Sequence, residues 1–579
     1  MFVPAWPNAI IRPDEKCIWI ILLRAPPVAD GTRVNAMKTK RSVDVFRSFS
    51  FSVRSPKDKS RLRRLLLIVF IFVGYLPAQG KENDWFTYLG NKTKPKAPRR
   101  HVSAAEALPP LPLPATPLRR TERKKPPQPD YLIGKVIWGE SASFVDSGGD
   151  KMEIADWNLC PTDMERFVGN GRSMDLQYHW QNINLNDFHF DPKKLPALLF
   201  SGVRTLRLSQ THIQALREYV LNGGMVICDS IAGSPYFYES AKKVFLEAFP
   251  ECRFRVIPTD HPLYHMLADV DRVNYPKKPG TNRPLMEGIY VGSRIGVLIS
   301  KYGLGCGWNR DITRLGKLPK AVYYDVKSAN QLGLNLAAYI VGYAEVGLLE
   351  GQPEVFGSAD QKIPTDEFVF AQLKHEGAWN VHPGGATALL MKLRQHTAVR
   401  VNLKRVAVDA EKDDLSSYPF LYLTGLDDFS FSEEAVTALR RYLNFGGVLL
   451  INNGMGLSTF DRAVRRELAQ ILPEAELEPI AANHHLYNSL LTIKEVRYSP
   501  VVAKNKPPPA AGLIKPSVAG LKNQPYVLGV TIDGDLRVLY SPYDIEAGWL
   551  DAYYPLIRGY ESIYAQQLGM NIITYVMTH

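Results

Sequence analysis

Two residues of this chain have side chains that could support nucleophilic catalysis, Cys228 and His261. Cys228 follows the apolar run 225–227, and a cysteine with an imidazole as its base is the arrangement of cysteine-dependent amidases and hydrolases. The sharp turn that exposes such a nucleophile needs glycines on both sides, but Val226 and Ser230 stand at those places. A buried, unreactive cysteine is the more common state of this residue type. We therefore assign no catalytic residue and keep activity through Cys228, with His261 as base, as an alternative.

A second group of residues has positions suited to binding a ligand. In an open α/β sheet, ligands lie beyond the carboxyl ends of the strands, at the point where the strand order reverses. Four loops are expected at such ends: 202–208, 228–236, 425–431 and 452–459. The candidate ligand-binding residues in these loops are Gly202, Asp229, Ser230, Gly425, Asn452 and Asn453.

No pattern in the sequence indicates a metal or a cofactor. The five cysteines contain no Cys-x-x-Cys pair, and His375-Glu376 lacks the spacing of a zinc-binding His-Glu-x-x-His helix. Glycines 303, 305 and 307 do not have the spacing of a dinucleotide-binding loop, and no Lys-Ser or Lys-Thr follows them. We expect neither a metal nor a cofactor.

Strands and helices must position these candidates, and both are readable in the sequence. The runs 197–201 and 420–424 are short and apolar and end at a glycine, which is typical of buried strands in a parallel sheet. Ser209 and Ser432 then stand where a helix N-cap is expected, and apolar residues recur at helical spacing behind them. A glycine pair ends each helix before the next apolar run. Strand, helix and strand joined by short links predict a parallel, doubly wound sheet.

The second half of the sequence repeats the first at a constant offset of 223 residues. The matching residues are Ser209 with Ser432, Leu216 with Leu439, Tyr219 with Tyr442, Gly223-Gly224 with Gly446-Gly447, and His261 with His484. With small gaps, Trp157-Asn158 also matches Trp379-Asn380, and Gly307-Trp308 matches Gly548-Trp549. The period is too long for a solenoid, so it indicates a duplicated domain.

In both halves a Gly-ended strand precedes a Ser-capped helix and a glycine pair, with His-x-Leu-Tyr and Gly-Trp further on, and this order resembles the DUF4159 family. The resemblance covers residues 131–345 and 366–579. It implies two tandem doubly wound α/β domains, flavodoxin-like and similar to class I glutamine amidotransferases. The family is bacterial and uncharacterised, so the resemblance implies no activity. Members often accompany MoxR-type ATPases and von Willebrand-type proteins of the cell envelope, which implies partners of that kind.

The N-terminal region has the pattern of a targeting segment. Arg61-Leu62-Arg63-Arg64 precedes the apolar run 65–76, and small residues follow it up to Gly80. This indicates a secretory signal peptide or a short membrane anchor. The distance from Met1 is unusual for a signal, and Met37 would be a more ordinary start.

Positive charge is concentrated in this same region. Residues 1–129 carry 25 Lys and Arg against 9 Asp and Glu, a net charge of +16, whereas the rest of the chain has a net charge of −4. The folded part therefore lacks the basic surface that nucleic-acid binding needs. Residues 91–129 contain ten prolines and predict an extended spacer, although such segments also serve as ligands of SH3-type domains.

The predicted organisation is a basic extension at 1–60, a signal or anchor at 61–80, and a Pro, Lys and Arg-rich linker at 81–130. The first α/β domain follows at 131–350, a second linker at 351–365, and the second α/β domain at 366–579. We expect an exported or membrane-anchored protein, periplasmic or otherwise outside the cytoplasm, with two non-catalytic binding or scaffold domains. A cysteine-dependent amidase or hydrolase and a periplasmic carbohydrate-directed protein are the alternatives.

Overall fold

The computed structural model describes residues 130–579, except for several short segments. These segments are 146–150, 173–176, 188, 190, 279, 281–282, 310–320, 353, 358–366 and 500–523. The predicted signal or anchor at 61–80 and the Pro-rich spacer lie outside the described residues. The two domains described below belong to the same compact unit of the chain.

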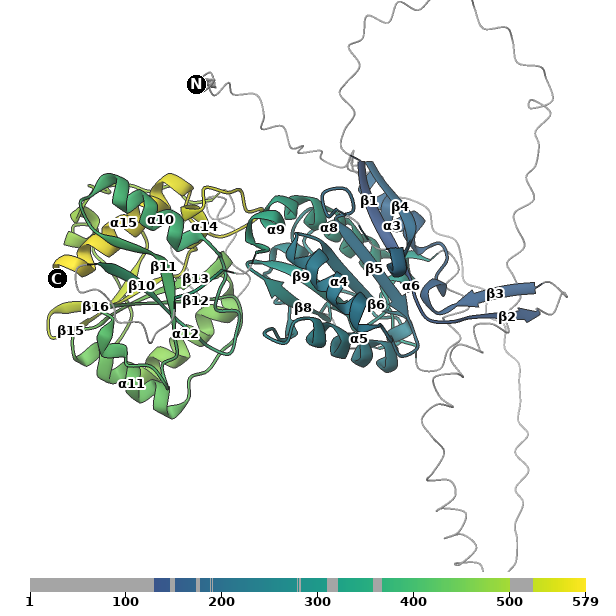
Figure 1. Ribbon diagram of the computed structural model, residues 1–579, viewed down its shortest axis with the longest axis horizontal. Coiled ribbons are helices and arrows are strands. Elements are labelled where there is room, and N and C mark those ends of the chain that lie inside the picture. The colour runs from purple at the N-terminus through teal and green to yellow at the C-terminus, as the bar shows by residue number, and fades with distance from the viewer. Residues whose placement is uncertain are drawn as a thin grey trace, which may run out of the picture. The chain divides into compact units, whose positions relative to one another are not determined.

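The first domain is built on a seven-stranded sheet (Figure 1). Its strands are, in spatial order, β4 (Gln177–Asn184), β1 (Asp130–Ile137), β5 (Ala197–Gly202), β6 (Met225–Ser230), β9 (Arg294–Ser300), β8 (Met286–Val291) and β7 (Arg255–Val256). The first five are parallel to one another, and β8 and β7 continue the sheet in antiparallel pairing. In chain order the parallel strands read 2-1-3-4-5, so the order reverses between β1 and β5, which is the doubly wound arrangement.

The second domain repeats this sheet strand for strand. Its order is β11 (Val401–Val408), β10 (Phe368–Leu373), β12 (Phe420–Gly425), β13 (Val448–Asn453), β16 (Asp535–Ser541), β15 (Leu528–Ile532) and β14 (Glu478–Pro479). Again five strands are parallel in the order 2-1-3-4-5 and two antiparallel strands follow. The predicted tandem α/β architecture is therefore confirmed.

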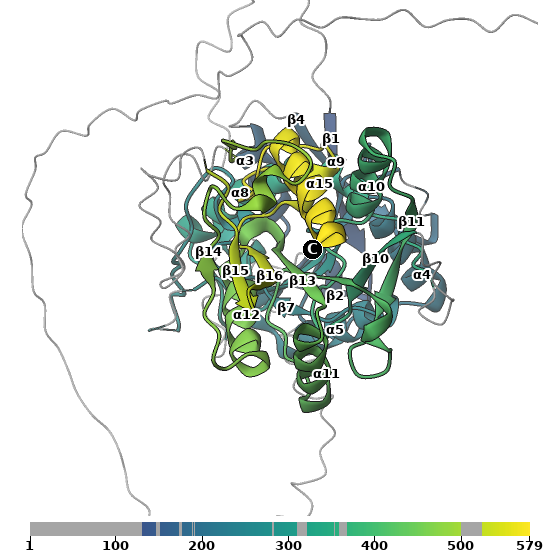
Figure 2. The ribbon, with the colours of Figure 1, turned by 90° about the vertical axis from the view of Figure 1, so that its left-hand side faces the viewer.

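Helices cover both faces of each sheet (Figures 1 and 2). In the first domain, α4 (Gln210–Leu221) and α5 (Pro235–Ala248) pack on one face, and α3 (Asp163–Arg172) and α8 (Val326–Gly342) pack on the other. The corresponding pairs of the second domain are α11 (Glu433–Asn444) with α12 (Ser458–Ile471), and α10 (Gly385–His396) with α15 (Ser562–Thr578). Short helices α6 (Gly305–Trp308) and α14 (Glu546–Trp549) follow β9 and β16, and α9 (Ala344–Glu350) leads out of the first domain.

The predicted serine N-caps and the glycines that follow the helices are confirmed. Ser209 and Ser432 are the N-caps of α4 and α11, and their hydroxyls accept hydrogen bonds from His212 N and Ala435 N. Gly223 and Gly446 follow these helices with φ of +102° and +100°, a conformation that glycine adopts readily. The small hairpin of β2 (Ser141–Val145) and β3 (Lys151–Ala155) has no described equivalent in the second domain, and the sequence patterns did not predict it.

The connection between the domains is partly anchored. Gly351 is buried against the end of α4, where an added Cβ would lie 2.0 Å from Leu221 O. Val355 is 74% exposed, but Glu354 between them binds the guanidinium of Arg405 in the second domain. No single helix among the described residues has the length and apolar composition to cross a membrane, although α8 and α9 meet both measures when taken as a pair bent by 48°.

Candidate functional site

A lysine and an aspartate form a buried ion pair at the carboxyl ends of the first domain's strands. Lys135 of β1 donates from Nζ to both carboxylate oxygens of Asp163, at 2.7 and 2.9 Å, and Asp163 begins helix α3. The ammonium also donates to Asn158 Oδ1 and to Cys160 O, at 3.0 and 3.1 Å. The two charged side chains are at most 1% exposed, so all three protons of the ammonium are used inside the protein.

Asp229 lies beside this pair at the end of β6. Its two carboxylate oxygens accept hydrogen bonds from Leu304 N and Gly305 N, each at 2.7 Å, where α6 begins. A Cβ on Gly305 would lie 2.9 Å from Asp229 Oδ2 and 3.2 Å from Asp163 Oδ2, so the two carboxylates converge on this glycine. Burial raises the pKa of Asp229 to about 7, against the effect of the two backbone donors.

Two thiols complete this arrangement, which we call the first centre: Lys135, Asp163, Asp229, Cys160 and Cys306. The side chains of Cys160 and Cys306 hydrogen-bond to each other, and this contact together with burial raises the pKa of Cys160 well above its ordinary value. Cys306 Sγ also accepts a hydrogen bond from Ala232 N at 3.1 Å. Ala232 has a φ of +54°, so the thiol holds a loop residue that is in a left-handed conformation.

The second domain has a buried ion pair at the same place, but different elements supply it. In the strand register, Gln372 lies opposite Tyr422, and Lys135 lies opposite Leu199, which is the equivalent of Tyr422 in the repeat. The second domain therefore has an amide at the place of the lysine. The positive charge comes instead from Arg405 on the neighbouring strand β11, whose Nη1 donates to Glu546 Oε1 at 3.1 Å. Both side chains are fully buried.

The carboxylate of the ion pair also comes from a different helix in each domain. In the first domain Asp163 begins α3 and Gly305 begins α6, whereas in the second domain Gly385 begins α10 and Glu546 begins α14. A Cβ on Gly385 would lie 2.9 Å from Glu546 Cγ, so each glycine leaves the space that the other helix's carboxylate fills. Burial raises the pKa of Glu546 to about 7, against the opposing effect of Arg405. Each domain therefore contains a buried ion pair at its strand ends and a buried carboxyl group with a pKa near neutrality: Asp229, beside the pair, in the first domain, and Glu546, a member of the pair, in the second.

An imidazole replaces the thiol pair in the second domain. By the match of the flanking Trp-Asn and Pro residues, His382 stands at the place of Cys160. His382 Nε2 lies 2.8 Å from Asp544 Oδ2, and its Nδ1 lies 2.7 Å from Glu350 Oε1 at the end of α9. Asp544 accepts a hydrogen bond from Met455 N, which matches Ala232 and has a φ of +57°. The second centre thus consists of Arg405, Glu546, Asn452, His382 and Asp544.

Two of the ligand-binding candidates predicted from the sequence, Asp229 and Asn452, lie in these centres. Asn452 Oδ1 accepts from Ile545 N at 2.9 Å, and its amide donates to Asp544 Oδ1 at 3.0 Å. Asn453 is turned to its own loop, where it bonds Leu457 N and Leu457 O. The hydroxyl of Ser230 is buried without a hydrogen-bond partner.

The two glycine candidates are packing positions. A Cβ on Gly202 would lie 2.2 Å from the Trp138 ring, and one on Gly425 would lie 2.4 Å from the Phe460 ring. These glycines allow aromatic rings to cover the strand ends. The neighbouring space is therefore filled by the protein.

Cys228 and His261 are not hydrogen-bonded to each other. Cys228 is fully buried among the side chains of α4 and α5, and burial raises the pKa of its thiol. His261 packs against Tyr290 and Tyr339, which belong to the cluster on the α3 and α8 face. Its Nδ1 accepts from Leu263 N at 3.1 Å, its Nε2 has no hydrogen-bond partner, and burial lowers its pKa to about 3.

The sequence analysis missed most of the charged residues in both centres. Lys135 stands inside an otherwise apolar strand, and a charge in such a place requires a partner, which is a signal that could have been used. The partner itself, Asp163, gives no comparable signal because acidic residues are common in the first turn of a helix.

The strand-end loops of the second domain are in contact with the first domain. Asp260 Oδ2 accepts a hydrogen bond from Ser458 N at 2.8 Å, at the first residue of α12. Arg255 Nε lies 2.9 Å from Asp427 Oδ2. Leu426 and Met455 pack in the same apolar cluster as the α8 side chains. Two of the loops expected to bind a ligand, 425–431 and 452–459, thus hold part of the first domain.

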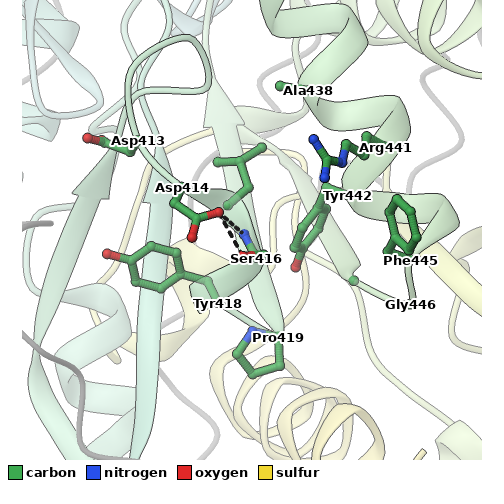
Figure 3. Close-up of a pocket in the computed structure, with 12 residues that line it drawn as sticks. Asp413, Asp414, Ser416, Tyr418, Pro419, Ala438, Arg441, Tyr442, Phe445 and Gly446 are labelled. Carbon is green, nitrogen blue, oxygen red and sulfur yellow. Dashed lines mark hydrogen bonds between the residues drawn. The ribbon is translucent and has the colours of Figure 1, made fainter.

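Chemically, both centres hold charges in place but offer little to a substrate. Their ionisable side chains are buried and hydrogen-bonded within the protein, and no group of three potential metal ligands occurs within the described ranges. A surface hollow of about 720 Å³ does occur in the second domain, but it lies next to the residues that precede β12 and β13, at their amino ends (Figure 3).

The comparison with family models agrees with the duplication. A model described as "Domain of unknown function (DUF4159)" matches residues 149–341 and, a second time, residues 369–577. No curated protein matches the chain.

The buried ion pair of the first centre should be essential for stability. Replacing Asp163 by alanine leaves the ammonium of Lys135 buried without a carboxylate, which typically costs about 3–5 kcal/mol. We expect Asp163→Ala to lower the free energy of unfolding by this amount in urea titrations. Adding Lys135→Met removes the stranded charge and should restore most of the loss. A single variant as stable as the parent would contradict this assignment.

The stability contributed by His382 should depend on pH. Burial alone would lower its pKa, but Asp544 and Glu350 outweigh burial and raise it well above 6.5. A raised pKa adds stability that is complete below the unfolded value and is lost as the pH rises through the folded value. The stability difference between the parent and His382→Gln should therefore be largest below pH 6.5 and shrink in alkaline buffer. A difference that is constant over this range would show that His382 is not protonated in the folded protein.

Proposed function

The chain belongs to the DUF4159 family, and on this basis we propose that it is an exported or membrane-anchored bacterial protein whose two α/β domains bind and hold partners without catalysing a reaction. The observation that carries this proposal is the closure of both strand-end centres. In a doubly wound sheet these ends are where a substrate would be bound and converted. Here Lys135, Asp163, Asp229 and Glu546 are each at most 1% exposed.

A hydrolytic role would also need an exposed nucleophile with a lowered pKa and a nearby base. Burial raises the pKa of Cys228, a hydrogen bond to Cys306 together with burial raises the pKa of Cys160, and neither thiol is exposed. These are properties of cysteines that serve packing and hydrogen bonding.

The contact between the domains supports a role in binding. The loops that follow β12 and β13 contact residues of the first domain through a helix N-terminus, an ion pair and apolar side chains. A strand-end face of this family can therefore hold protein surface in place of a small substrate. We propose that the corresponding face of the first domain holds a partner protein in the same manner.

The location and the partners are proposed from the sequence. The basic and apolar pattern at 61–80 supports export or membrane anchoring. The partners would be proteins of a bacterial envelope complex, including a MoxR-type ATPase and von Willebrand-type proteins, as the family resemblance implies. Cell fractionation with an antibody against the C-terminal domain should recover the protein outside the cytoplasm. Recovery of all full-length protein in the soluble cytoplasm would contradict this part of the proposal.

Cys228 provides the test of the non-catalytic role. We expect its thiol to resist iodoacetamide in the folded protein at neutral pH, because it is buried and its pKa is raised. Cys252 serves as the internal control: burial also raises its pKa, to about 12, but it is partly exposed, so it should be alkylated faster, as measured by mass spectrometry of the peptides.

The variant Cys228→Ser should fold with a lower melting temperature, because the hydroxyl enters an apolar site at a cost of about 1–3 kcal/mol. Rapid alkylation of Cys228, together with loss of a measurable amidase or hydrolase activity in the serine variant, would replace the binding role with an enzymatic one.

A further inference from the structure

We propose that the strand-end face of the first domain, formed by loops 202–208 and 228–236, binds a second copy of this chain. The copy would dock through the edge of its second domain that carries Glu476 and Glu478. The proposal rests on the binding role proposed above for this face and names its partner. Its evidence is the contact between the two domains of one chain, compared with the two equivalent surfaces that this contact does not use.

The contact between the domains joins two different surfaces. The first domain contributes the edge of its sheet at β7 and the residues just before η5 (Pro262–Tyr264), and the second domain contributes its strand-end loops. The domains are copies of one fold, so each has both surfaces, and the contact uses one surface of each. The strand-end face of the first domain and the edge of the second domain at β14 and η8 (His485–Asn488) can therefore meet when two chains lie head to tail.

The strand order identifies equivalent residues on these surfaces. β7 and β14 pair with β8 and β15 in the same antiparallel manner, so Glu478 stands at the place of Arg255. Arg204 and Asp427 each stand two residues after the glycine that ends β5 or β12, so they are equivalent as well. The residues of the existing contact can thus be compared one by one with those of the other two surfaces.

An ion pair of the contact has both of its charges reversed on the other surfaces. Within one chain, Arg255 Nε lies 2.9 Å from Asp427 Oδ2. The equivalent residues are Glu478 and Arg204, again an acid and a base but exchanged between the two surfaces. A pair in which both signs are reversed is still attractive, so this position remains complementary.

A second group of charges shows the same exchange. Arg253 Nη1 lies 3.0 Å from Glu376 Oε2, and Ser430 Oγ donates to the other oxygen of this carboxylate at 3.1 Å. Glu476 stands at the place of Arg253, and Arg207, which is exposed, stands at the place of Ser430. Inside one chain a basic edge meets an acidic face, and between two chains an acidic edge would meet a basic face.

The buried carboxylate of the contact is replaced together with its donor. Asp260 Oδ2 accepts a hydrogen bond from Ser458 N at 2.8 Å, at the first residue of α12. Asn483 stands at the place of Asp260, and Pro235, the first residue of α5, stands at the place of Ser458. Proline has no N–H to donate, so the charge and the donor are absent from the two surfaces together.

The guanidinium that accompanies this carboxylate is replaced in the same way. Arg558 Nη1 lies 3.4 Å from Asp260 Oδ2, and Arg558 N donates to the residue of positive φ in the loop after β13. In the first domain Val322 N donates to the residue of positive φ in the loop after β6, so a valine stands at the place of this arginine. A valine facing Asn483 leaves no buried charge without a partner.

The edge of the second domain is exposed where its counterpart is covered. His261 is fully buried in the first domain, whereas the equivalent His484 is partly exposed and His485 beside it is exposed. Glu476 and Glu478 are exposed as well. The first domain packs this edge against a neighbouring domain, and in the second domain the same edge is accessible to a neighbouring chain.

Self-association of the full-length chain tests the proposal. We expect sedimentation velocity in a mild detergent to show assembly that grows between about 1 and 100 μM, the range of weak protein contacts. Assembly should weaken at high salt, because charged pairs contribute to it. A chain that stays monomeric over this range would overturn the proposal.

Charge reversal identifies the two surfaces. Arg207→Glu and Glu476→Arg should each weaken self-association at least tenfold, because each places like charges opposite one another. An equimolar mixture of the two variants should recover most of the affinity, since the reversed charges then face each other across the contact. A mixture that associates no better than either variant alone would overturn the proposal.

Lys404→Glu is the matched control for the change of charge. Lys404 is exposed on β11, at the opposite edge of the second domain's sheet from β14, so its reversal should leave self-association unchanged. An equal loss in this variant would show that net charge controls assembly and would overturn the proposal. Thermal melting of each variant checks that it is folded.

A different occupant of the acidic edge gives a different result. If the basic N-terminal region bound there, Glu476→Arg would weaken association and Arg207→Glu would not, which would overturn the proposal. None of these measurements bears on the reactivity of Cys228 or on cell fractionation. The proposed self-association and the proposed function can therefore fail separately.

Discussion

A charge buried at the carboxyl end of a parallel strand must have an opposite charge beside it, and both domains are organised around this requirement. Lys135 and Arg405 are fully buried cations, and leaving either without its carboxylate would cost about 3–5 kcal/mol, a large share of one domain's stability. Each is held by a carboxylate from the first turn of a helix, Asp163 or Glu546. The helices that carry these carboxylates are thereby fixed against the strand ends, together with the loops that precede them.

The two domains meet the requirement with different residues because the space at the strand ends is shared. A carboxylate on either of two helices can reach the same point, provided that the other helix begins with glycine. Each of the two domains has one of these two arrangements. The same exchange occurs at the neighbouring position, where the thiols of Cys160 and Cys306 do in one domain what His382 and Asp544 do in the other.

This closure limits what the strand ends can do. Charges that are bonded to one another hold the loops in place, and the loops of the second domain then hold residues of the first. His382 connects the second centre to the first domain, since one imidazole nitrogen contacts Asp544 at the strand end and the other contacts Glu350 at the end of α9. Glu350 in turn accepts hydrogen bonds from Ser293 in the first domain and Tyr554 in the second. The strand-end face therefore carries protein contacts, which accords with a binding role.

The sequence by itself determined the features that depend on neighbouring residues. The serine caps, the glycines after the helices, the buried strands and the duplication were all predictable, because caps and periodicity involve residues within a few positions of each other. Even the positions of Asp229 and Asn452 at strand ends followed from this local pattern.

The tertiary structure alone decided which side chains meet. Lys135 and Asp163 are 28 residues apart, Arg405 and Glu546 are 141 apart, and His382 and Asp544 are 162 apart. Strand order and register bring these pairs together, and neither the order nor the register can be predicted from the residues that adjoin each member in the sequence. Aligning the two halves could not reveal the pairs either, because the charges stand on different elements in each copy: lysine matches glutamine, and aspartate matches glycine.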